Sequence, residues 1–367
     1  MTGARPSGPP ALPDFPWDRL LPAAEIARSH PAGIVDLSVG TPVDPTPAVV
    51  QVALAAASDA SGYPLTAGTV RLREAAAGWL HRRCGVTVDP VALLPTIGSK
   101  ELVASLPAQL GISGAVSYPG LAYPTYEVGA RLAGCEGVPA DSLTALGPRR
   151  VGLLWVNSPA NPTGQVLPVD HLRKVVTWAR QRGTVIASDE CYVELGWDAE
   201  PVSILHPDVC DGDHTGLLAV HSLSKRSNLA GYRAAFVAGD PALVAGLLAL
   251  RRHAGLMMPT PVQVAMAAAL DDDAHVTEQR ERYRRRRDKL RSALTYAGFS
   301  IEHSEGGLYL WATAGDPCWE TVHDLAGLGI LVAPGDFYGA AGAQYVRVAL
   351  TATDERVAAA VDRLRSG

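Results

Sequence analysis

Short apolar runs alternate with helical patterns through the first part of the chain. The runs at 151–157, 184–189 and 217–222 predict buried strands, because each is short, is apolar and ends at a polar residue. A helical pattern at 169–182 separates the first two runs. Strand–helix–strand alternation is typical of an α/β fold, in which helices cover both faces of a mostly parallel sheet. Ligands bind beyond the carboxyl ends of such strands, so functional residues are expected there.

The C-terminal part has a different pattern. It predicts a smaller α+β unit, with strands at 300–303, 308–313, 330–334 and 345–350 and helices at 317–328 and 353–365. Long helical patterns at 241–256 and 261–297 precede it. We therefore expect a large domain over 45–275 and a small C-terminal domain over 276–367, with the boundary inside the second long helix. Residues 1–44 are expected to form an N-terminal arm, loose over 1–13, and part of the small domain.

The composition argues against several classes of protein. The formal net charge is −5, without the basic bias of a nucleic-acid-binding protein. The run Arg284–Arg287 lies among acidic residues, in a pattern typical of an exposed helix face. No apolar stretch reaches the ~18 residues of a membrane span. The cysteines are scattered without CxxC spacing, which argues against structural metal and disulfides. We expect a cytoplasmic protein without nucleic-acid, membrane or metal partners.

One lysine has unusual neighbours. Lysines are rare in this chain, with four among 32 basic residues. Lys225 follows the strand predicted at 217–222, in the segment His-Ser-Leu-Ser-Lys, and Arg233 lies eight residues further on. Burial and nearby positive charge favour the unprotonated amine that a Schiff base with an aldehyde requires. The hydroxyls of Ser222 and Ser224 and the guanidinium of Arg233 are suitable phosphate ligands.

Two other strand ends carry side chains suited to a cofactor with a pyridine ring. Asp189 ends the strand predicted at 184–189, where its carboxylate can pair with a protonated ring nitrogen and keep the ring electron-withdrawing. By itself, Asp189 is also typical of a helix cap. The segment 157–164, Asn-Ser-Pro-Ala-Asn-Pro-Thr-Gly, predicts a rigid turn from which Asn161 can donate to a phenolic oxygen, although this motif alone is an ordinary turn.

Together these motifs resemble the class I and II, fold-type I aminotransferases, which use pyridoxal phosphate (PLP), and the resemblance covers almost the full chain. It implies an α/β fold with a mostly parallel seven-stranded sheet between helices in a large domain, plus a smaller α+β domain. It also implies that Lys225 forms the Schiff base with PLP and that Asp189 pairs with the ring nitrogen. Asn161 and Tyr192 are similar to the pair that hydrogen-bonds the phenolic oxygen.

The resemblance assigns the remaining cofactor contacts as well. Gly98-Ser99-Lys100 resembles the backbone cradle at a helix N-terminus that receives the phosphate through unpaired amides. Tyr123, in Ala-Tyr-Pro-Thr-Tyr, is similar to the aromatic residue that stacks on the ring. The side chains that complete the phosphate site would be Ser222, Ser224 and Arg233.

Three further residues match positions of the family that act on substrate or partner. Arg347, in Tyr-Val-Arg-Val-Ala-Leu, is similar to the arginine that holds the substrate α-carboxylate, for which a planar fork suits better than lysine. Read alone, it is also compatible with a surface strand arginine. Gly40 is similar to the glycine that closes over the substrate. Tyr63, in Gly-Tyr-Pro-Leu-Thr-Ala-Gly, is similar to a tyrosine that reaches the phosphate of the neighbouring subunit, which implies a homodimer with shared active sites.

Some segments resemble one group within that family, the N-succinyldiaminopimelate aminotransferases of the lysine and cell-wall pathway. These segments are Asp14-Phe-Pro-Trp-Asp, Leu37-Ser-Val-Gly-Thr-Pro-Val-Asp-Pro, Ser188-Asp-Glu-Cys-Tyr, Val209-Cys-Asp-Gly-Asp-His-Thr, Leu308-Tyr-Leu-Trp-Ala-Thr and Ala333-Pro-Gly-Asp-Phe-Tyr-Gly. The resemblance implies ping-pong transfer between L-glutamate and N-succinyl-2-amino-6-oxopimelate, with release of 2-oxoglutarate. The remote carboxylates of that substrate need cationic partners, and Lys100, Arg226 and His253 are the candidates.

The residues leave other functions open. The alternatives are an aminotransferase of aspartate, alanine or an aromatic amino acid, and a PLP-dependent C–S β-lyase. A non-enzymatic regulator with an aminotransferase-like domain is disfavoured. Such regulators carry an added DNA-binding segment, and residues 1–13 are too few for one.

Overall fold

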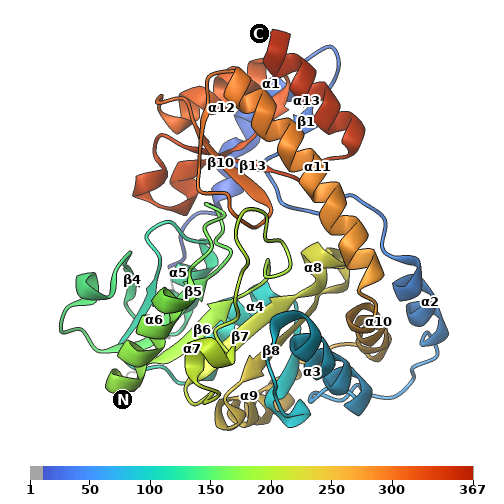
Figure 1. The fold of residues 1–367 in the computed structure, drawn as a ribbon, viewed down its shortest axis with the longest axis vertical. Coiled ribbons are helices and arrows are strands. Elements are labelled where there is room, and N and C mark those ends of the chain that lie inside the picture. Colours follow the sequence, from blue (N-terminus) through green and yellow to red (C-terminus); the bar gives the residue numbers. More distant parts are fainter. Residues whose placement is uncertain (1–10, 367) are drawn as a thin grey trace, which may run out of the picture.

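A seven-stranded sheet forms the centre of the larger lobe. The computed structural model describes residues 11–366, and in it this lobe and a smaller one lie one above the other (Figure 1). Strand β8 runs antiparallel to both of its neighbours, and the other strand pairs are parallel. The mostly parallel α/β sheet predicted from the sequence is therefore confirmed. In spatial order the strands are β2 (Leu93–Ile97), β8 (Ala234–Gly239), β7 (Leu217–Ser222), β6 (Val185–Asp189), β5 (Val151–Asn157), β3 (Ala115–Tyr118) and β4 (Gly137–Pro139).

Helices cover both faces of this sheet, which explains why its strands are apolar throughout. Successive residues of β7 alternate between two apolar clusters: Leu217 and Ala219 belong to one, Leu218 and Val220 to the other. The helices of the first cluster include α3 (Val70–Cys84), α6 (Val169–Arg182) and α10 (Thr260–Asp271), and those of the second include α4 (Ser99–Gln109), α5 (Thr125–Leu132) and α9 (Pro241–Ala254). Among residues 11–366, no helix is long and apolar enough to cross a membrane.

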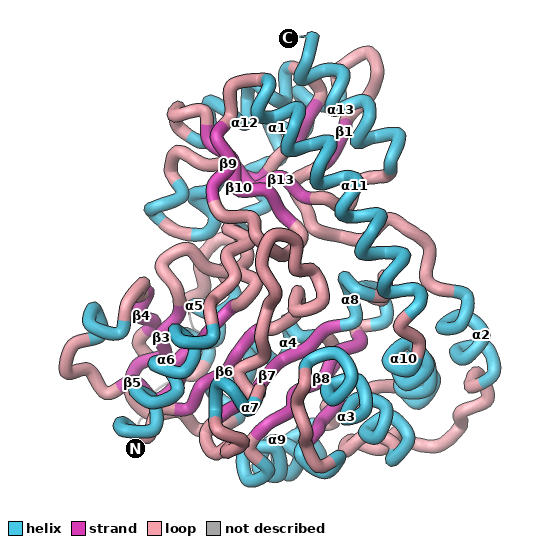
Figure 2. Tube along the Cα trace, in the orientation of Figure 1, coloured by secondary structure: helices cyan, strands magenta, loops and turns pink. Residues whose placement is uncertain are grey.

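The shorter helices of this lobe lie in its connections. They are α2 (Ala48–Ala56), α7 (Pro207–Cys210) and α8 (Leu223–Arg226), with 3-10 turns at η2 (Pro90–Ala92), η3 (Leu143–Leu146) and η4 (Ala230–Tyr232). Helix α3 begins where the Thr69 hydroxyl accepts a hydrogen bond from the Leu72 amide at 3.1 Å, and it ends at Gly85 in the left-handed region. The loops that carry the site residues leave the carboxyl ends of the parallel strands (Figure 2).

The small lobe combines both ends of the chain. A four-stranded antiparallel sheet has the order β12 (Ala333–Pro334), β13 (Val346–Ala349), β10 (Tyr309–Thr313) and β9 (Ser300–Glu302). Strand β1 (Val35–Asp36) pairs with β11 (Ile330–Leu331), and α1 (Leu21–Arg28) packs on α12 (Cys318–Gly327). The remaining segments are α13 (Asp354–Ser366), η1 (Pro16–Leu20), η5 (Gly335–Tyr338) and η6 (Ala340–Gly342). The domain boundaries given above stay a prediction.

Two sequence expectations about elements were wrong. The helix expected over 261–297 is two helices, α10 and α11 (Ala274–Tyr296), because Asp272 is extended and its carboxylate accepts from the Ala274 amide at 2.9 Å. Consecutive aspartates favour such local side-chain bonds over a helix interior. The strand expected over 330–334 is likewise divided between two sheets, as β11 and β12.

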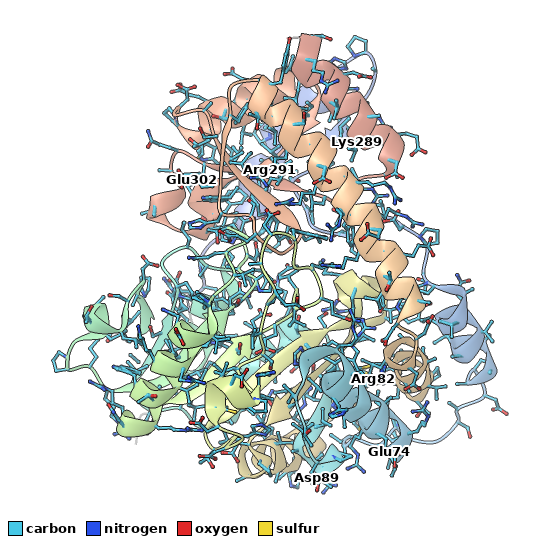
Figure 3. All side chains as sticks on the ribbon, viewed as in Figure 1. Glu74, Arg82, Asp89, Lys289, Arg291 and Glu302 are labelled. Atoms are coloured by element: carbon cyan, nitrogen blue, oxygen red, sulfur yellow. The ribbon has the colours of Figure 1, made fainter. Side chains whose placement is uncertain are left out.

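The basic run on α11 was also misread. Of the run expected to be exposed, Arg286 and Arg287 are buried, whereas Lys289 on the same helix is exposed (Figure 3). The Arg286 guanidinium pairs with both oxygens of Asp44, at 2.7 and 2.8 Å. Since Asp44 lies on the chain between β1 and α2, this ion pair joins α11 to the segment that leads into the large lobe. Burial alone would raise the pKa of Asp44, but hydrogen bonds from Arg286 and Gln279 hold it below its usual value.

Asp44→Asn should therefore destabilise the fold. Removing one partner of a buried pair leaves the other charge uncompensated, and because Arg286 keeps a second carboxylate, Asp354, we expect a loss of about 2 kcal/mol. Urea unfolding followed by fluorescence measures it. The matched control is Glu127→Gln, which breaks the exposed i,i+4 pair with Arg131 and should cost about 0.5 kcal/mol or less. Equal effects of the two substitutions would contradict the role given to Asp44.

Candidate active site

A cavity of about 830 Å³ lies beyond the carboxyl ends of the parallel strands, with walls from both lobes. Most residues predicted from the sequence meet there. Those lining it are Gly40, Ser99, Lys100, Tyr123, Asn161, Asp189, Tyr192, Ser222, Ser224, Lys225, Arg233 and Arg347. Further lining residues come from the chain start and include Leu12, Phe15 and Trp17; the last two belong to the segment Asp14-Phe-Pro-Trp-Asp, to which no role in the site had been assigned.

Gly98 and Tyr63 do not line this cavity. Gly98 precedes α4 with a φ of 78°, and a side chain there would collide with the guanidinium of Arg233. Glycine thus lets Arg233 approach the first amides of α4, which places a cation at a helix N-terminus, a combination that binds phosphate. Tyr63 is 94% exposed, away from the cavity of its own chain.

The Lys225 amine lies at the centre of the cavity wall. It is carried by the short helix α8, whose first turn is capped by the Ser222 hydroxyl accepting from the Ser224 amide at 3.2 Å. The amine donates to the Gly40 carbonyl. Burial lowers the pKa of Lys225, and the positive charges of Arg347 and Arg233 act in the same direction. The fold therefore favours the neutral, nucleophilic amine.

Asp189 places a buried carboxylate at the end of β6. Its Oδ2 accepts from the Tyr126 hydroxyl at 2.9 Å and its Oδ1 from the Cys191 amide at 3.2 Å. Burial raises the pKa of Asp189 above its usual value, and the two hydrogen bonds oppose this. Among the described residues, no basic side chain forms an ion pair with Asp189, so the carboxylate is available to a cation in the cavity.

A side-chain bridge holds the neighbouring turn against β6. The Asn157 amide donates to the Asp189 carbonyl at 2.8 Å and to the Pro159 carbonyl at 3.2 Å, and its Oδ1 accepts from the Asn161 amide at 2.7 Å. This arrangement fixes the Asn161 side chain next to the cavity, where its Oδ1 accepts from Arg347 at 2.8 Å. The turn thereby links the end of the large sheet to a cation of the small lobe.

Arg347 is a buried cation on β13, only 2% exposed. One terminal nitrogen donates to Asn161 and the other to the Ser38 carbonyl at 2.7 Å, while Nε has no acceptor among the described residues. No carboxylate in the described part of the chain pairs with it. Its guanidinium lies over the ring of Tyr309, 3.8 Å from the centroid, which fixes the plane of the fork.

These residues fit bound PLP. A buried carboxylate and a buried guanidinium, each without a charged protein partner, face one cavity, and an uncompensated buried charge is costly unless a ligand supplies its counterpart. The pyridine nitrogen suits Asp189, a substrate carboxylate suits Arg347, and the cofactor phosphate suits the start of α4 with Arg233. When bound, PLP supplies the carbonyl carbon that accepts an amino group and the ring that withdraws electrons.

The comparisons with known proteins agree with this chemistry. Residues 32–364 match the family "Aminotransferase class I and II", and the chain belongs to this PLP-dependent family. The crystal structure of an aminotransferase from Neisseria meningitidis Z2491 superposes with a TM-score of 0.88, at 34% identity and 97% coverage of each chain. The fold and the cofactor expected from the resemblance are thus confirmed.

Two relatives are much more similar in sequence. The Mycobacterium tuberculosis protein named "Probable aminotransferase Rv1178" is 66% identical over 96% of this chain and 85% of its own length. The Streptomyces rimosus enzyme named "4-dedimethylamino-4-oxo-anhydrotetracycline transaminase OxyQ" is 62% identical over 96% of this chain and 99% of its own. Both names describe transaminases, and they indicate no single acceptor.

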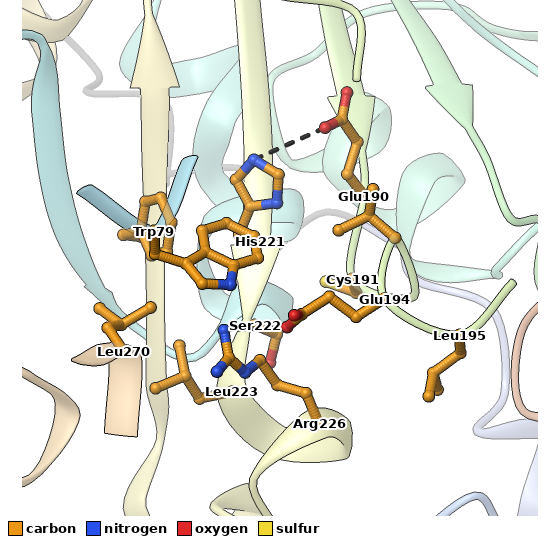
Figure 4. Close-up of a pocket in the computed structure, with 12 residues that line it drawn as sticks. Trp79, Glu190, Cys191, Glu194, Leu195, His221, Ser222, Leu223, Arg226 and Leu270 are labelled. Atoms are coloured by element: carbon orange, nitrogen blue, oxygen red, sulfur yellow. Dashed lines mark ion pairs between the residues drawn. The ribbon is translucent and has the colours of Figure 1, made fainter. Parts of the chain in front are cut away.

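Two of the three residues considered for the remote carboxylates lie elsewhere. Arg226 points away from the cavity into a buried polar cluster, where it pairs with Glu194 at 2.9 Å (Figure 4). In the same cluster Glu190 Oε2 lies 3.5 Å from His221 Nε2 (Figure 4). His253 is exposed near the end of α9 and does not line the cavity. Lys100 alone of the three lines it.

Sequence reasoning missed two tyrosines of the site. Tyr126 donates to Asp189, and Tyr309 lies between Arg347 and Tyr192. A signal existed for each. Tyr126 lies three positions after the predicted stacking residue Tyr123, within α5. Tyr309 lies in a predicted strand, but the sequence does not reveal that this strand pairs with the one that carries Arg347.

Lys225→Ala should abolish transamination and the covalent attachment of PLP. The reason is that the buried amine of Lys225 faces the cavity with a lowered pKa, while Lys100, the other lysine lining the cavity, lies in the first turn of α4 beside Arg233. Borohydride reduction followed by peptide mapping locates the attached cofactor. Lys100→Met is the control and should still carry the label at position 225. Label on Lys100, Lys174 or Lys289 in the parent protein would contradict the assignment.

Proposed function

We propose that the chain transfers an amino group from L-glutamate to N-succinyl-2-amino-6-oxopimelate, forming N-succinyl-LL-2,6-diaminopimelate and 2-oxoglutarate. The observation that carries this proposal is a basic side chain in the cavity, Lys100, besides those assigned to the cofactor and the α-carboxylate. Arg347 can hold the α-carboxylate of either substrate, and Lys100 offers a partner for a carboxylate at a distance from it. The resemblance of segments outside the cofactor site to N-succinyldiaminopimelate aminotransferases supports the same acceptor.

Lys100 is suited to this role by its surroundings. Its backbone amide belongs to the first turn of α4, so the phosphate needs no part of its side chain. The ammonium lies 5.5 Å from the ring centroid of Phe15, at the rim formed by the chain start. Burial lowers the pKa of Lys100, and Arg233 adds to this effect. A carboxylate bound next to the ammonium would raise the pKa of Lys100 again and stabilise its charged form.

The residues of the large lobe then have separate tasks in the reaction. Asp189 would hold a positive charge at the pyridine nitrogen, and Asn161 and Tyr192 would hold the phenolic oxygen. Lys225 would take the proton from the substrate Cα and later return it, because its lowered pKa favours the free amine that acts as a base. Tyr123 would stack on the ring. The two half-reactions use one site in turn, which makes the kinetics ping-pong.

A second candidate function follows from the walls of the cavity. Leu12, Phe15, Trp17, Val39 and Val128 are apolar and line the space beyond the catalytic lysine. Such walls also suit a bulky cyclic ketone, the kind of acceptor that the name of OxyQ describes for that relative. Aspartate, alanine, aromatic amino acids and C–S β-elimination are the remaining alternatives, and each gives a distinct product.

A panel of acceptors with glutamate as donor tests the proposal. We expect the succinylated keto acid to exceed pyruvate, oxaloacetate and phenylpyruvate in kcat/KM by about tenfold or more, because shorter acceptors leave Lys100 unpaired. At saturating PLP, Lys100→Met should lower the ratio of kcat/KM between the succinylated and the shorter acceptors by about tenfold. Lys174→Met, on the exposed side of α6, should leave this ratio unchanged. A cyclic ketone that exceeds the succinylated acceptor and is insensitive to Lys100→Met would favour the second candidate. Keto acid released without any acceptor would indicate a lyase.

We also propose that the active unit is a homodimer in which Tyr63 serves the partner's phosphate site. The supporting feature is the exposure of Tyr63 within a chain segment that also exposes Leu65 and Val70, at 61% and 59%. Large exposed apolar side chains are typical of a contact surface when they lie together. Tyr63 and Leu65 lie in the loop between α2 and α3, Val70 begins α3, and none of the three lines the cavity of its own chain.

Mixing two inactive variants checks the shared site. A heterodimer of Tyr63→Ala and Lys225→Ala chains contains one site with both residues intact, so random mixing should restore about a quarter of the parent activity at limiting PLP. The measurement is activity after co-refolding, with each variant alone as control. If Tyr63 acted within its own chain, every site of the heterodimer would be defective and no activity would return.

A further inference from the structure

Tyr309 lies at the meeting point of the two lobes' catalytic groups. It begins β10, directly beside the strand that carries Arg347, and only 4% of it is exposed. In the pairing of β10 with β13, Tyr309 lies opposite Ala349. Arg347, two residues before Ala349, is therefore a diagonal neighbour on the same face of the sheet, close enough for its long side chain to reach the Tyr309 ring. The guanidinium accordingly lies 3.8 Å from the ring centroid. The ring of Tyr309 therefore sets the plane in which Arg347 presents its donors.

The hydroxyl of Tyr309 faces the other way, toward the cofactor-binding groups. It lies 3.2 Å from the Tyr192 hydroxyl, and the two rings meet edge to face. A phenol has one proton to donate. When Tyr192 donates that proton to the phenolic oxygen of PLP, its own oxygen is left to accept, and Tyr309 is the donor in reach.

Gly40 provides an independent observation on the same tyrosine. A Cβ built on Gly40 would collide with the Tyr309 hydroxyl and would lie 2.8 Å from each of the ring atoms Cε1 and Cζ. Its φ is not in the left-handed region, so space and not backbone conformation requires glycine here. The same residue accepts from Lys225 through its carbonyl. The ring of Tyr309 thus determines how closely segment 38–40 approaches the catalytic amine.

We propose that Tyr309 is a positioning residue for the transamination: its ring orients Arg347, its hydroxyl donates to Tyr192, and its bulk makes glycine necessary at position 40. The inference rests on the aminotransferase activity and not on the choice of acceptor. Charges around the phenol agree with the geometry. Burial would raise the pKa of Tyr309, but the positive charges of Arg347 and Lys225 act in the opposite direction, and a phenol beside positive charge is a stronger hydrogen-bond donor.

The absorption of the bound cofactor tests the hydroxyl without any substrate. In Tyr309→Phe, Tyr192 loses the hydrogen bond that it accepts and becomes a weaker donor to the phenolic oxygen of PLP. More negative charge then stays on that oxygen, and the proton on the Lys225 nitrogen is held more tightly. The pH midpoint of the absorption change should rise by about 0.5–1 unit. Tyr345→Phe removes a phenol that stacks on Trp311 outside the cavity, and its midpoint should equal the parent's. A Tyr309→Phe midpoint equal to or below the parent's overturns the role of the hydroxyl.

Kinetics with the best amino donor test the ring. Tyr309→Phe keeps the stack on Arg347 and should change KM by less than about threefold, whereas Tyr309→Leu loses it and should raise KM by about tenfold. If Tyr309 had only a structural role, the substitutions would lower the melting temperature, but the two variants would have the same KM. Equal KM values for Phe and Leu overturn the orienting role.

A double-mutant cycle tests the dependence of Gly40 on Tyr309. Gly40→Ala should lose at least about tenfold in kcat/KM, because the added methyl group displaces either the ring or segment 38–40. The Gly40→Ala/Tyr309→Leu double variant opens the space, so its kcat/KM should exceed the value expected from multiplying the two single effects. Multiplicative effects, or a fully active Gly40→Ala protein, would show that the contact does not constrain the site.

Discussion

The site depends on two buried charges of opposite sign that no charged group among residues 11–366 neutralises. Asp189 ends a strand of the large sheet and Arg347 lies in the small sheet, and both face one cavity. Each is held by neutral donors or acceptors, chiefly Tyr126 for the carboxylate and Asn161 for the guanidinium. Burying such groups costs stability that the surrounding core must provide. A ligand that brings a cation to Asp189 and a carboxylate to Arg347 would offset that cost.

The sequence was sufficient to predict the position of those site residues that lie at or just after the end of a strand. Lys225, Asp189 and Asn161 each follow a strand within a few residues, so strand periodicity placed them at one sheet edge, and the cavity contains all three. Resemblance added Arg347 and the start of α4. These predictions work because a parallel sheet brings its carboxyl ends together whatever the intervening helices are.

What the sequence did not reveal depends on contacts between distant segments. The pairing of Arg286 with Asp44 and the contact between Tyr309 and Gly40 join residues more than two hundred positions apart, and neither partner carries a local signal for the other. Charge pattern alone made Arg286 look exposed, because a helix face next to a second lobe has the same composition as one next to water. Arg226 was misassigned for a similar reason: it follows Lys225 in the sequence, but its side chain enters a different, buried cluster, where it pairs with Glu194.

Segment 38–40 has a consequence for how the enzyme responds to its substrates. Its Ser38 carbonyl accepts from Arg347 and its Gly40 carbonyl from Lys225, so two amide oxygens of one short stretch face two of the groups proposed to act on the substrate. A carboxylate that takes both terminal nitrogens of Arg347 must displace the Ser38 carbonyl from one of them. Because both carbonyls belong to the same three residues, the main chain links binding at Arg347 to the surroundings of the Lys225 amine.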